Sequence, residues 1–581
     1  MEWKKRPSVV RFANCEVDLP AGEIRKAGIR IRIQHQPFKV LEALLERPGE
    51  AVTREELRAR IWPAEGFGDF DQAVNIAVTK LRNALGDSAE KPRFIETLPR
   101  RGYRFIAAVE QAPASSSMVE KKMLAVLPFE NLGGDAEQDY FADGLTEELI
   151  AQLGQLSPKR LGVIARTSAV QYKSTKKPIR EIARELHVEY VLEGSVRREG
   201  TRARITAQLI EVADETHLWS ERYDRELRDI LGVQQDVARH VGRALAFELL
   251  PKQGAGAGAA AAATDPEAHE AFLRGRFFWG IRSEDALVRA IGFFEKAISR
   301  EPKFGRAYSG IADCCNLLCW FGALTPREAG PKAGSAAKHA LELDEGQSEA
   351  HASMALVRYW YEWDWRGAEE EFRRAIELNP SYAPAHHWYS SYLNSLGRVD
   401  EAQWELKRAR ECDPLSLIIT MSAADPYFFS RQYDRAIEQL EAVLEHAPRF
   451  APALFNLGRV YAAKQMYEEA IAAFEKAAQL SGNREAFPAL ADAYARNGRR
   501  AEARGILEEM QKHTNGRYLA APLLARIHLG LGETDRAIER LEQGVEERSF
   551  WMTMLKMDPV YDEIRGDARF HELLRRVGFW A

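Results

Sequence analysis

The sequence predicts a multidomain protein, in which a small α+β head, an α/β middle domain and an all-α repeat body follow one another. Two stretches of small residues divide the chain, QAPASSS at 111–117 and a Gly/Ala-rich run at 251–263, and both have the composition of linkers. In the head, the spacing of apolar residues alternates between the periods of strands and helices, and in the middle block it is mostly that of strands. In the last block it is helical, with a repeat of 34 residues. We therefore expect domains at 1–110, 118–250 and 264–581.

Charge is unevenly distributed along the chain. Residues 1–110 hold 20 Lys and Arg against 16 Asp and Glu, whereas the remainder holds 61 against 70. A basic head on an acidic body indicates that a polyanionic partner would bind the head.

Cysteine content and hydropathy indicate in which cellular compartment the protein is expected. Five cysteines in 581 residues do not suggest a disulfide framework and suit a reducing environment. The start, MEWKKRPSVV, has no apolar signal-peptide segment, and no run of about 18 apolar residues occurs. We expect a cytoplasmic protein without a membrane partner.

The head begins with short strands, continues with helices and closes with a hairpin. Pro37 suits a first helical turn, Thr53 with Glu56 forms a capping box, and Gly86 ends a third helix. The expected elements are strands at 9–12, 15–19 and 29–33, helices at 37–46, 53–62 and 71–85, and a hairpin of 93–98 with 103–109. This order of elements is that of a winged helix-turn-helix.

The third of these helices has two dissimilar faces. Val74, Val78, Leu81 and Leu85 recur at the spacing of a buried stripe. An isoleucine lies on the opposite face among amides, a hydroxyl and a lysine. Such a mixture of apolar and hydrogen-bonding groups suits the edges of base pairs better than bulk water.

The segment VNIAVTKLRNALGD (74–87), followed by PRFIETLPRRGYRF (92–105), resembles the OmpR/PhoB-type DNA-binding domain, in the style of its ToxR/CadC-like members. The resemblance covers about residues 8–108. It implies a bacterial regulator whose third helix lies in the major groove of double-stranded promoter DNA. The implied DNA-binding residues are Gln72, Asn75, Ile76, Thr79, Lys80, Arg82, Asn83, Thr97, Arg100, Arg101 and Arg104.

On the helix, the resemblance implies contacts to bases and nearby phosphates. Asn75 or Asn83 would read adenine or contact phosphate, and Ile76 would pack on a thymine methyl. Arg82 is expected at a phosphate. The alternatives are that Lys80 and Arg82 only solvate the helix, and that Ile76 packs against the wing or in a homodimer on DNA.

On the wing, Thr97 is expected at the DNA backbone or a base edge, and the three arginines at phosphates or the minor groove. Arg104 has an alternative, an ion pair with a carboxylate of the sheet. Tyr103 and Trp62 are expected in the core. The loop at 63–70 occupies the place where relatives touch RNA polymerase, which is a candidate partner.

The middle block predicts strands at 123–129 and 161–165, helices at 140–156 and 179–187, and a hairpin turning at 198–200. The segments LAVLPFENL, DYFADGLTEEL, YVLEGSVRR and LWSERYDREL resemble the TolB-type N-terminal α/β domain. That family implies an interaction or sensory module without an active site. Signal input is expected here or in the repeats, because no receiver domain with a phosphoacceptor Asp precedes the head.

The last block is periodic. Helical segments stop every 34 residues, at Pro380, Pro414, Pro448, Gly482 and Gly516, a period that resembles tetratricopeptide repeats. We expect about eight units and a C-terminal cap, with a protein or peptide partner on the concave face. The alternative is a spacer or dimerisation scaffold. The aromatic cluster at 359–365 is expected in the core, with a peptide-binding patch as its alternative.

No catalytic constellation emerges from the sequence. Cys314, Cys315 and Cys319 lack a second ligand pair, so we expect buried small residues and no metal. We predict no catalytic residues, no cofactor and no enzyme activity. The function expected is a sequence-specific DNA-binding transcriptional regulator, and the alternative is a tetratricopeptide interaction scaffold whose head does not bind DNA.

Overall fold

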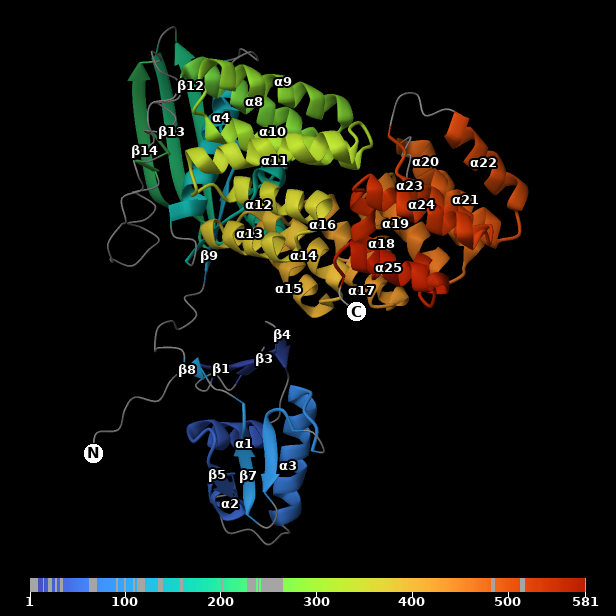
Figure 1. Cartoon of the computed structure of the whole chain (residues 1–581). Coiled ribbons are helices and arrows are strands. Elements are labelled where there is room, and N and C mark those ends of the chain that lie inside the picture. Colours follow the sequence, from blue (N-terminus) through green and yellow to red (C-terminus); the bar gives the residue numbers. More distant parts are fainter. Residues whose placement is uncertain are drawn as a thin grey trace. The chain divides into compact units, whose positions relative to one another are not determined.

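The computed structural model describes residues 9–13, 15–18, 23–26, 29–31, 35–61, 70–89, 92–98, 101–107, 110–111, 121–133, 139–156, 160–199, 202–226, 237–238, 240–241, 265–481, 486–512 and 518–579 (Figure 1). The chain forms two compact units, Met1–Val119 and Glu120–Ala581. Both predicted linkers lie outside the described residues, except Gln111. No described helix is both long enough and apolar enough to cross a membrane.

An antiparallel sheet opens the head. Its strand order is β4-β3-β2-β1-β8, formed by β1 (Val9–Phe12), β2 (Cys15–Asp18), β3 (Glu23–Lys26), β4 (Ile29–Ile31) and β8 (Glu110–Gln111). Val10, Phe12, Val17 and Ile24 are buried. The sequence did not predict β3, because Ile24 is the only apolar residue in EIRK.

Three helices and a second sheet complete the head and confirm the predicted winged helix-turn-helix. The helices are α1 (His35–Glu46), α2 (Arg54–Ile61) and α3 (Phe70–Leu85). Strands β6 (Ile95–Leu98) and β7 (Gly102–Phe105) form the wing hairpin, and β5 (Ala51–Thr53) pairs with the other edge of β7. Leu41 and Leu44 of α1 are fully buried in the core that α3 and the hairpin share.

The middle block is an α/β domain with strand order β11-β9-β12-β13-β14. Its strands are β9 (Lys122–Val126), β10 (Glu130–Asn131), β11 (Leu161–Val163), β12 (Tyr190–Glu199), β13 (Arg202–Glu211) and β14 (Thr216–Glu226), and its helices are α4 (Asp139–Leu156), α5 (Arg166–Ala169), the 3-10 turn Val170–Tyr172 and α6 (Ile179–Leu186). Strand β9 pairs in parallel with β11 and β12, and the pairs β12–β13 and β13–β14 are antiparallel.

Side chains of β9 alternate between the two faces of this sheet. Leu124 and Val126 join the core with α4, whereas Ala125 joins the core with α6. The predicted strands and helices are confirmed. Strand β14 was missed, since THLWSERYDRE is mostly polar.

Helix pairs stack along 265–579 (Figure 1). The pairs are α8 (Pro266–Ile281) with α9 (Glu284–Arg300), α10 (Gly305–Trp320) with α11 (Pro326–Leu343), α12 (Ser348–Val357) with α13 (Trp365–Leu378), α14 (Ala383–Leu396) with α15 (Val399–Cys412), α16 (Leu417–Ser422) and α17 (Asp425–Phe429) with α18 (Tyr433–His446), α19 (Ala451–Ala463) with α20 (Tyr467–Ser481), α21 (Ala486–Arg496) with α22 (Arg500–Lys512), and α23 (Ala521–Gly530) with α24 (Thr534–Glu546). The 3-10 turns Phe550–Met554 and Pro559–Ile564 and helix α25 (Ala568–Arg576) follow them.

The 34-residue period has a physical basis in this stack. Helices α13, α15 and α18 each end two residues before Pro380, Pro414 or Pro448, where a proline cannot continue the backbone hydrogen bonds. Close helix contacts need small residues. A Cβ on Gly458 would lie 2.6 Å from the Phe474 ring, so α19 and α20 approach only because glycine is there.

The aromatic and cysteine clusters of the repeats belong to the core. Tyr359, Trp360, Tyr361 and Trp363 are at most 7% exposed, which confirms the core interpretation over a peptide-binding patch. Tyr359, Trp360 and Tyr361 belong to a single π-helical turn, Arg358–Glu362, and Trp363 follows it. The three cysteines of α10 are buried, and within the described residues no group of His, Cys, Asp and Glu is placed to hold a metal ion.

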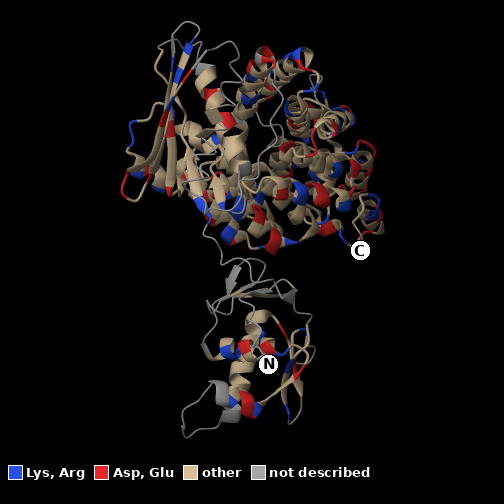
Figure 2. Cartoon of the chain, turned by 90° about the vertical axis from the view of Figure 1, so that its left-hand side faces the viewer, with Lys and Arg blue, Asp and Glu red and all other residues tan. Residues whose placement is uncertain are grey.

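The α/β domain contacts the first repeats through buried polar groups. Glu147 of α4 accepts from Arg166 at 3.0 Å and from Arg276 of α8 at 3.4 Å. Asp413, at the end of α15, accepts from the hydroxyl of Ser168 at 2.5 Å and from that of Thr167. Basic and acidic residues are otherwise interspersed over the helices (Figure 2). The first repeats thus already bind one domain of their own chain.

Candidate nucleic-acid interface

Helix α3 presents the two faces that its sequence predicts. Val74, Val78, Leu81 and Leu85 are at most 1% exposed and anchor the helix in the head. On the other side Ile76 is 49% exposed and lies among polar neighbours. The other exposed side chains of this face are those of Asn75, Thr79, Lys80 and Asn83.

The end of α3 is coupled to the wing. Gly86 adopts a left-handed φ of 69°, and the Asp87 amide donates to the Arg82 carbonyl at 2.9 Å, which closes the helix. The carboxylate of Asp87 then accepts from the backbone amides of Arg93, Phe94 and Ile95 at 2.7 to 3.2 Å. The LGD motif therefore fixes where the wing starts relative to the helix.

The side chain of Arg82, which was expected at a phosphate, makes hydrogen bonds within the head. Its side chain is 8% exposed, and Nη2 donates to the Ile95 carbonyl at 2.7 Å and to the Thr97 hydroxyl at 2.8 Å. The guanidinium thus joins α3 to strand β6 of the wing. Thr97 is exposed, and its hydroxyl accepts a hydrogen bond from Arg82. Thr97 therefore also takes part in holding the wing against α3.

Asn75 is exposed but held in place. Its carbonyl oxygen accepts from the Tyr103 hydroxyl at 2.6 Å and from Nη1 of Arg54 at 3.0 Å. The Arg54 guanidinium also lies 5.3 Å from the centre of the Tyr103 ring. A bidentate contact to adenine needs both the oxygen and the NH₂ of an asparagine. With two donors on its oxygen, Asn75 presents its NH₂ group as a donor.

Arg54 and Tyr103 are the positioning residues that sequence reasoning did not identify. Tyr103 was expected in the core and is 2% exposed, yet its hydroxyl reaches the surface helix. Arg54 directly follows Thr53, whose predicted capping box with Glu56 is confirmed by reciprocal hydrogen bonds of 2.7 and 3.1 Å. A basic residue in the first turn after a cap was the only available signal for Arg54.

Thr79 and Lys80 also lie on the exposed face of α3. The Thr79 hydroxyl donates to the backbone carbonyl of Asn75 at 2.8 Å, and its oxygen can still accept a further hydrogen bond. Lys80 is exposed one position further along the helix. The side chain of Gln72 lies outside the described residues, although its backbone is part of α3.

The wing turn depends on a glycine. Gly102 has a φ of 146°, and a Cβ there would lie 2.1 Å from the Val52 carbonyl of β5, so only glycine fits. The Arg101 amide closes the turn on the Leu98 carbonyl at 3.0 Å, and the Arg101 side chain is exposed. Arg100 and Trp62 lie outside the described residues, as do residues 63–69 of the predicted polymerase loop at 63–70.

Arg104 forms the ion pair that was its alternative role. It faces Glu96 across the hairpin, and its guanidinium donates to the Glu96 carboxylate at 2.6 and 2.9 Å. The positive charge of Arg104 therefore has a neighbour of opposite sign.

Comparisons with known protein families agree with this geometry. Residues 28–105 match the model described as transcriptional regulatory protein, C terminal. The head is an OmpR/PhoB-type winged-helix domain. Behind this OmpR/PhoB-type domain, residues 120–240 match the second domain of HilA/YgeH-like transcriptional regulators, and residues 353–415 and 422–486 match the tetratricopeptide repeat. The expected TolB-type resemblance of the middle domain stays a prediction.

Proteins with sequences similar to this chain include transcriptional regulators. The transcriptional regulator HilA of Salmonella typhimurium is 22% identical over 397 residues, which are 68% of each chain. A cholera toxin homolog transcriptional activator of Vibrio parahaemolyticus is 38% identical over 87 residues, 15% of this chain and 30% of that protein. A Rhizobium meliloti protein provisionally named adenylate cyclase 3 is 38% identical over 252 residues. The alignment spans 41% of this chain and 40% of the Rhizobium protein.

Proposed function

We propose that this protein is a sequence-specific DNA-binding regulator of transcription that reads double-stranded promoter DNA with α3. The observation that carries the proposal is the exposed face of α3, where Ile76 stands beside Asn75, Thr79 and Lys80 on a helix whose other side is fully buried. An apolar group between donors matches a major groove, which offers thymine methyls next to acceptor atoms.

The geometry supports specific roles for the helix residues. Asn75 donates through its NH₂ group to an acceptor on a base edge or a phosphate, because its oxygen is engaged. Ile76 packs on a thymine methyl, and Thr79 contacts an adjacent base. Lys80 and Asn83 contact the phosphates that line the groove, and Gln72 precedes them on the same helix.

The wing contributes charge and alignment. Arg101 is exposed at the turn and contacts phosphate or the minor groove, and Arg100 precedes it in the sequence. Arg104 contributes less, since Glu96 pairs with it. Arg82 and Thr97 act as positioning residues that hold the wing against α3.

Further partners follow from the domain composition. We propose a protein or peptide on the repeats, which would supply the regulatory input in a cytoplasmic protein. RNA polymerase at the loop before α3 and a homodimer on DNA belong to the same proposal. The adenylate cyclase name of one relative is not carried over, because the alignment covers less than half of that protein.

Mobility shifts of the full chain on genomic fragments test this function. We expect binding that weakens steeply with salt and is lost in the double variant Lys80→Ala/Arg101→Ala. Lys512→Ala, a basic residue of the repeats that pairs with Glu508, is the matched control and should bind as the parent does. If the parent protein shows no binding even at low salt, the chain is an interaction scaffold and the proposal is wrong.

A further inference from the structure

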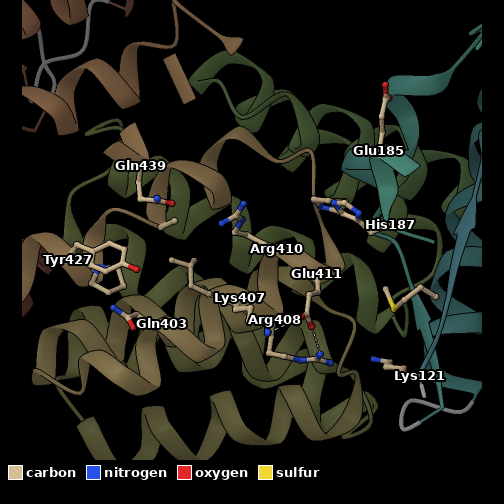
Figure 3. A pocket seen from close by; sticks show the side chains of 15 residues that line it. Lys121, Glu185, His187, Gln403, Lys407, Arg408, Arg410, Glu411, Tyr427 and Gln439 are labelled. Atoms are coloured by element: carbon tan, nitrogen blue, oxygen red, sulfur yellow. Dashed lines mark hydrogen bonds and ion pairs between the residues drawn. The ribbon is translucent and has the colours of Figure 1, made fainter. Parts of the chain in front are cut away.

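A cavity of about 650 Å³ lies between the α/β domain and the repeats. Its walls come from the start of β9, the end of α6, helix α15 and the α17–α18 region (Figure 3). Both walls belong to the same compact unit. The volume is within the range of pockets that hold small organic ligands, roughly 300–1,000 Å³.

The cavity carries an excess of positive charge. Lys121, Lys407, Arg408 and Arg410 line it together with two acids, Glu185 and Glu411. Both acids already have basic partners. Glu185 accepts from Lys177 at 2.7 and 2.9 Å, and Glu411 pairs with Arg408 and lies 3.8 Å from Lys407.

Two of the cations have no such partner. Within the described residues neither Lys121 nor Arg410 makes a hydrogen bond or an ion pair, whereas Arg408 next to them does. Burial lowers the pKa of Lys121. The Arg408 charge acts in the same direction, and Cys412 and Glu411 act against it without reversing the shift. An ammonium group held in a half-buried place beside another cation is costly, and an anion in the cavity would relieve that cost.

The opposite end of the cavity has a different chemistry. Figure 3 shows one side of the cavity formed by Tyr427, Gln403 and Gln439. The other side is formed by Lys121 and Arg408, and Arg410 lies between the two sides. Within the described residues the side chains of Gln403, Gln439 and Tyr427 have no hydrogen-bond partner. A phenol ring with two amides offers a stacking surface and both donors and acceptors for a heterocycle.

We propose that this cavity binds a small phosphorylated ligand that carries an aromatic ring, of the nucleotide type. Its phosphate contacts Lys121, Arg408 and Arg410, and its ring lies against Tyr427 with edge contacts to Gln403 and Gln439. Lys121 is the first described residue after the segment that joins the two units, so the bound ligand lies next to that segment along the chain. Such a site goes beyond the proposed DNA binding and does not depend on it.

Thermal shift and calorimetry on the full chain test the site, with AMP, ADP, ATP, pyrophosphate and adenosine as probes. We expect at least one of the nucleotides to raise the Tm and to bind more tightly than pyrophosphate, and adenosine not to bind. Lys121→Ala and Arg410→Ala should each weaken nucleotide binding by about tenfold or more, because each removes a charge-assisted hydrogen bond.

Matched variants separate the two ends of the site. Gln439→Ala should weaken nucleotide binding and leave pyrophosphate binding unchanged, and Lys512→Ala should change neither. Arg410 is exposed, so its variant should keep the circular dichroism spectrum and Tm of the free protein. The proposal is overturned if none of the three nucleotides binds, if pyrophosphate binds as tightly as they do, or if binding survives in both Lys121→Ala and Arg410→Ala.

Discussion

The Tyr103 hydroxyl lies 2.6 Å from the side-chain oxygen of Asn75, so a buried residue of the wing holds an exposed residue of α3. Arg54 donates to the same oxygen and lies over the Tyr103 ring. Helix α2, helix α3 and the wing therefore meet at one amide. Its orientation is set before any DNA arrives, which lowers the ordering cost of binding.

Tyr103→Phe tests this arrangement. We expect affinity for a selected DNA site to fall by roughly threefold to tenfold, the worth of one hydrogen bond, since Asn75 loses part of its support. Fluorescence anisotropy on labelled DNA measures it. Tyr518→Phe, which removes a hydroxyl bonded to Glu547 in the repeats, is the matched control. Equal affinity of parent and Tyr103→Phe would show that the orientation of Asn75 does not matter for binding.

Arg82→Ala should mainly lower the stability of the head, and the loss of its positive charge should matter less for DNA binding. The variant loses two buried hydrogen bonds to the wing strand, and we expect the head to lose about 1.5–3 kcal/mol of unfolding free energy. Hydrogen exchange of the amides at 95–98 measures this loss. Lys80→Ala is the contrasting variant. Its amide hydrogen exchange should not change, and the slope of log affinity against log salt concentration should fall by about the contribution of one phosphate contact. If DNA binding by Arg82→Ala depends less on salt while amide exchange at 95–98 is no faster, Arg82 contacts a phosphate and does not support the wing.

The difference between Lys80 and Arg82 shows where sequence reasoning reached its limit. Periodicity placed Val74, Val78, Leu81 and Leu85 correctly, because their spacing alone decides which face of α3 is buried. Arg82 lies at the margin between the faces, and the direction of its long side chain depends on where the wing packs.

The register of the wing hairpin is the second feature that the sequence alone does not determine. Arg104 pairs with Glu96 only because the hairpin aligns these two residues across β6 and β7, and a shift of one position would have turned them to opposite faces. The sequence could therefore offer both roles for Arg104 without choosing. The cavity between the α/β domain and the repeats depends on contacts between residues more than 200 positions apart, which no local pattern contains.

Glu56 should titrate well below an ordinary glutamate. Its carboxylate accepts from the Thr53 amide and from Arg47, and these bonds lower its pKa from 4.5 to about 2. Because the pKa of the folded head is the lower one, the stabilisation is complete above pH 4.5 and is lost as the pH falls toward 2. Because the carboxylate is exposed, solvent screening limits how much this shift contributes to stability.

A carbon NMR titration of the Glu56 carboxyl measures this shift directly. The midpoint should lie near 2 in the parent protein and move upward in Arg47→Ala, since one of the two bonded partners is removed. A midpoint near 4.5 in the parent would mean that the capping box does not persist in solution.

Ile76→Ser should change which sequences the protein prefers, and not only how tightly it binds. Ile76 is 49% exposed between Asn75 and Thr79, so the proposed thymine methyl contact is its main source of binding energy. Loss of a contact of one or two methyl-sized groups costs about 1 kcal/mol, or roughly fivefold, at one base position. Competitive binding to a randomised site, read by sequencing, should show a weakened thymine preference at that position and an unchanged salt dependence. Val288→Ser, which alters a valine of α9 that is 57% exposed, should leave the preference intact. If Ile76→Ser instead weakens binding to all sequences equally, Ile76 contributes to a dimer contact on DNA and reads no base.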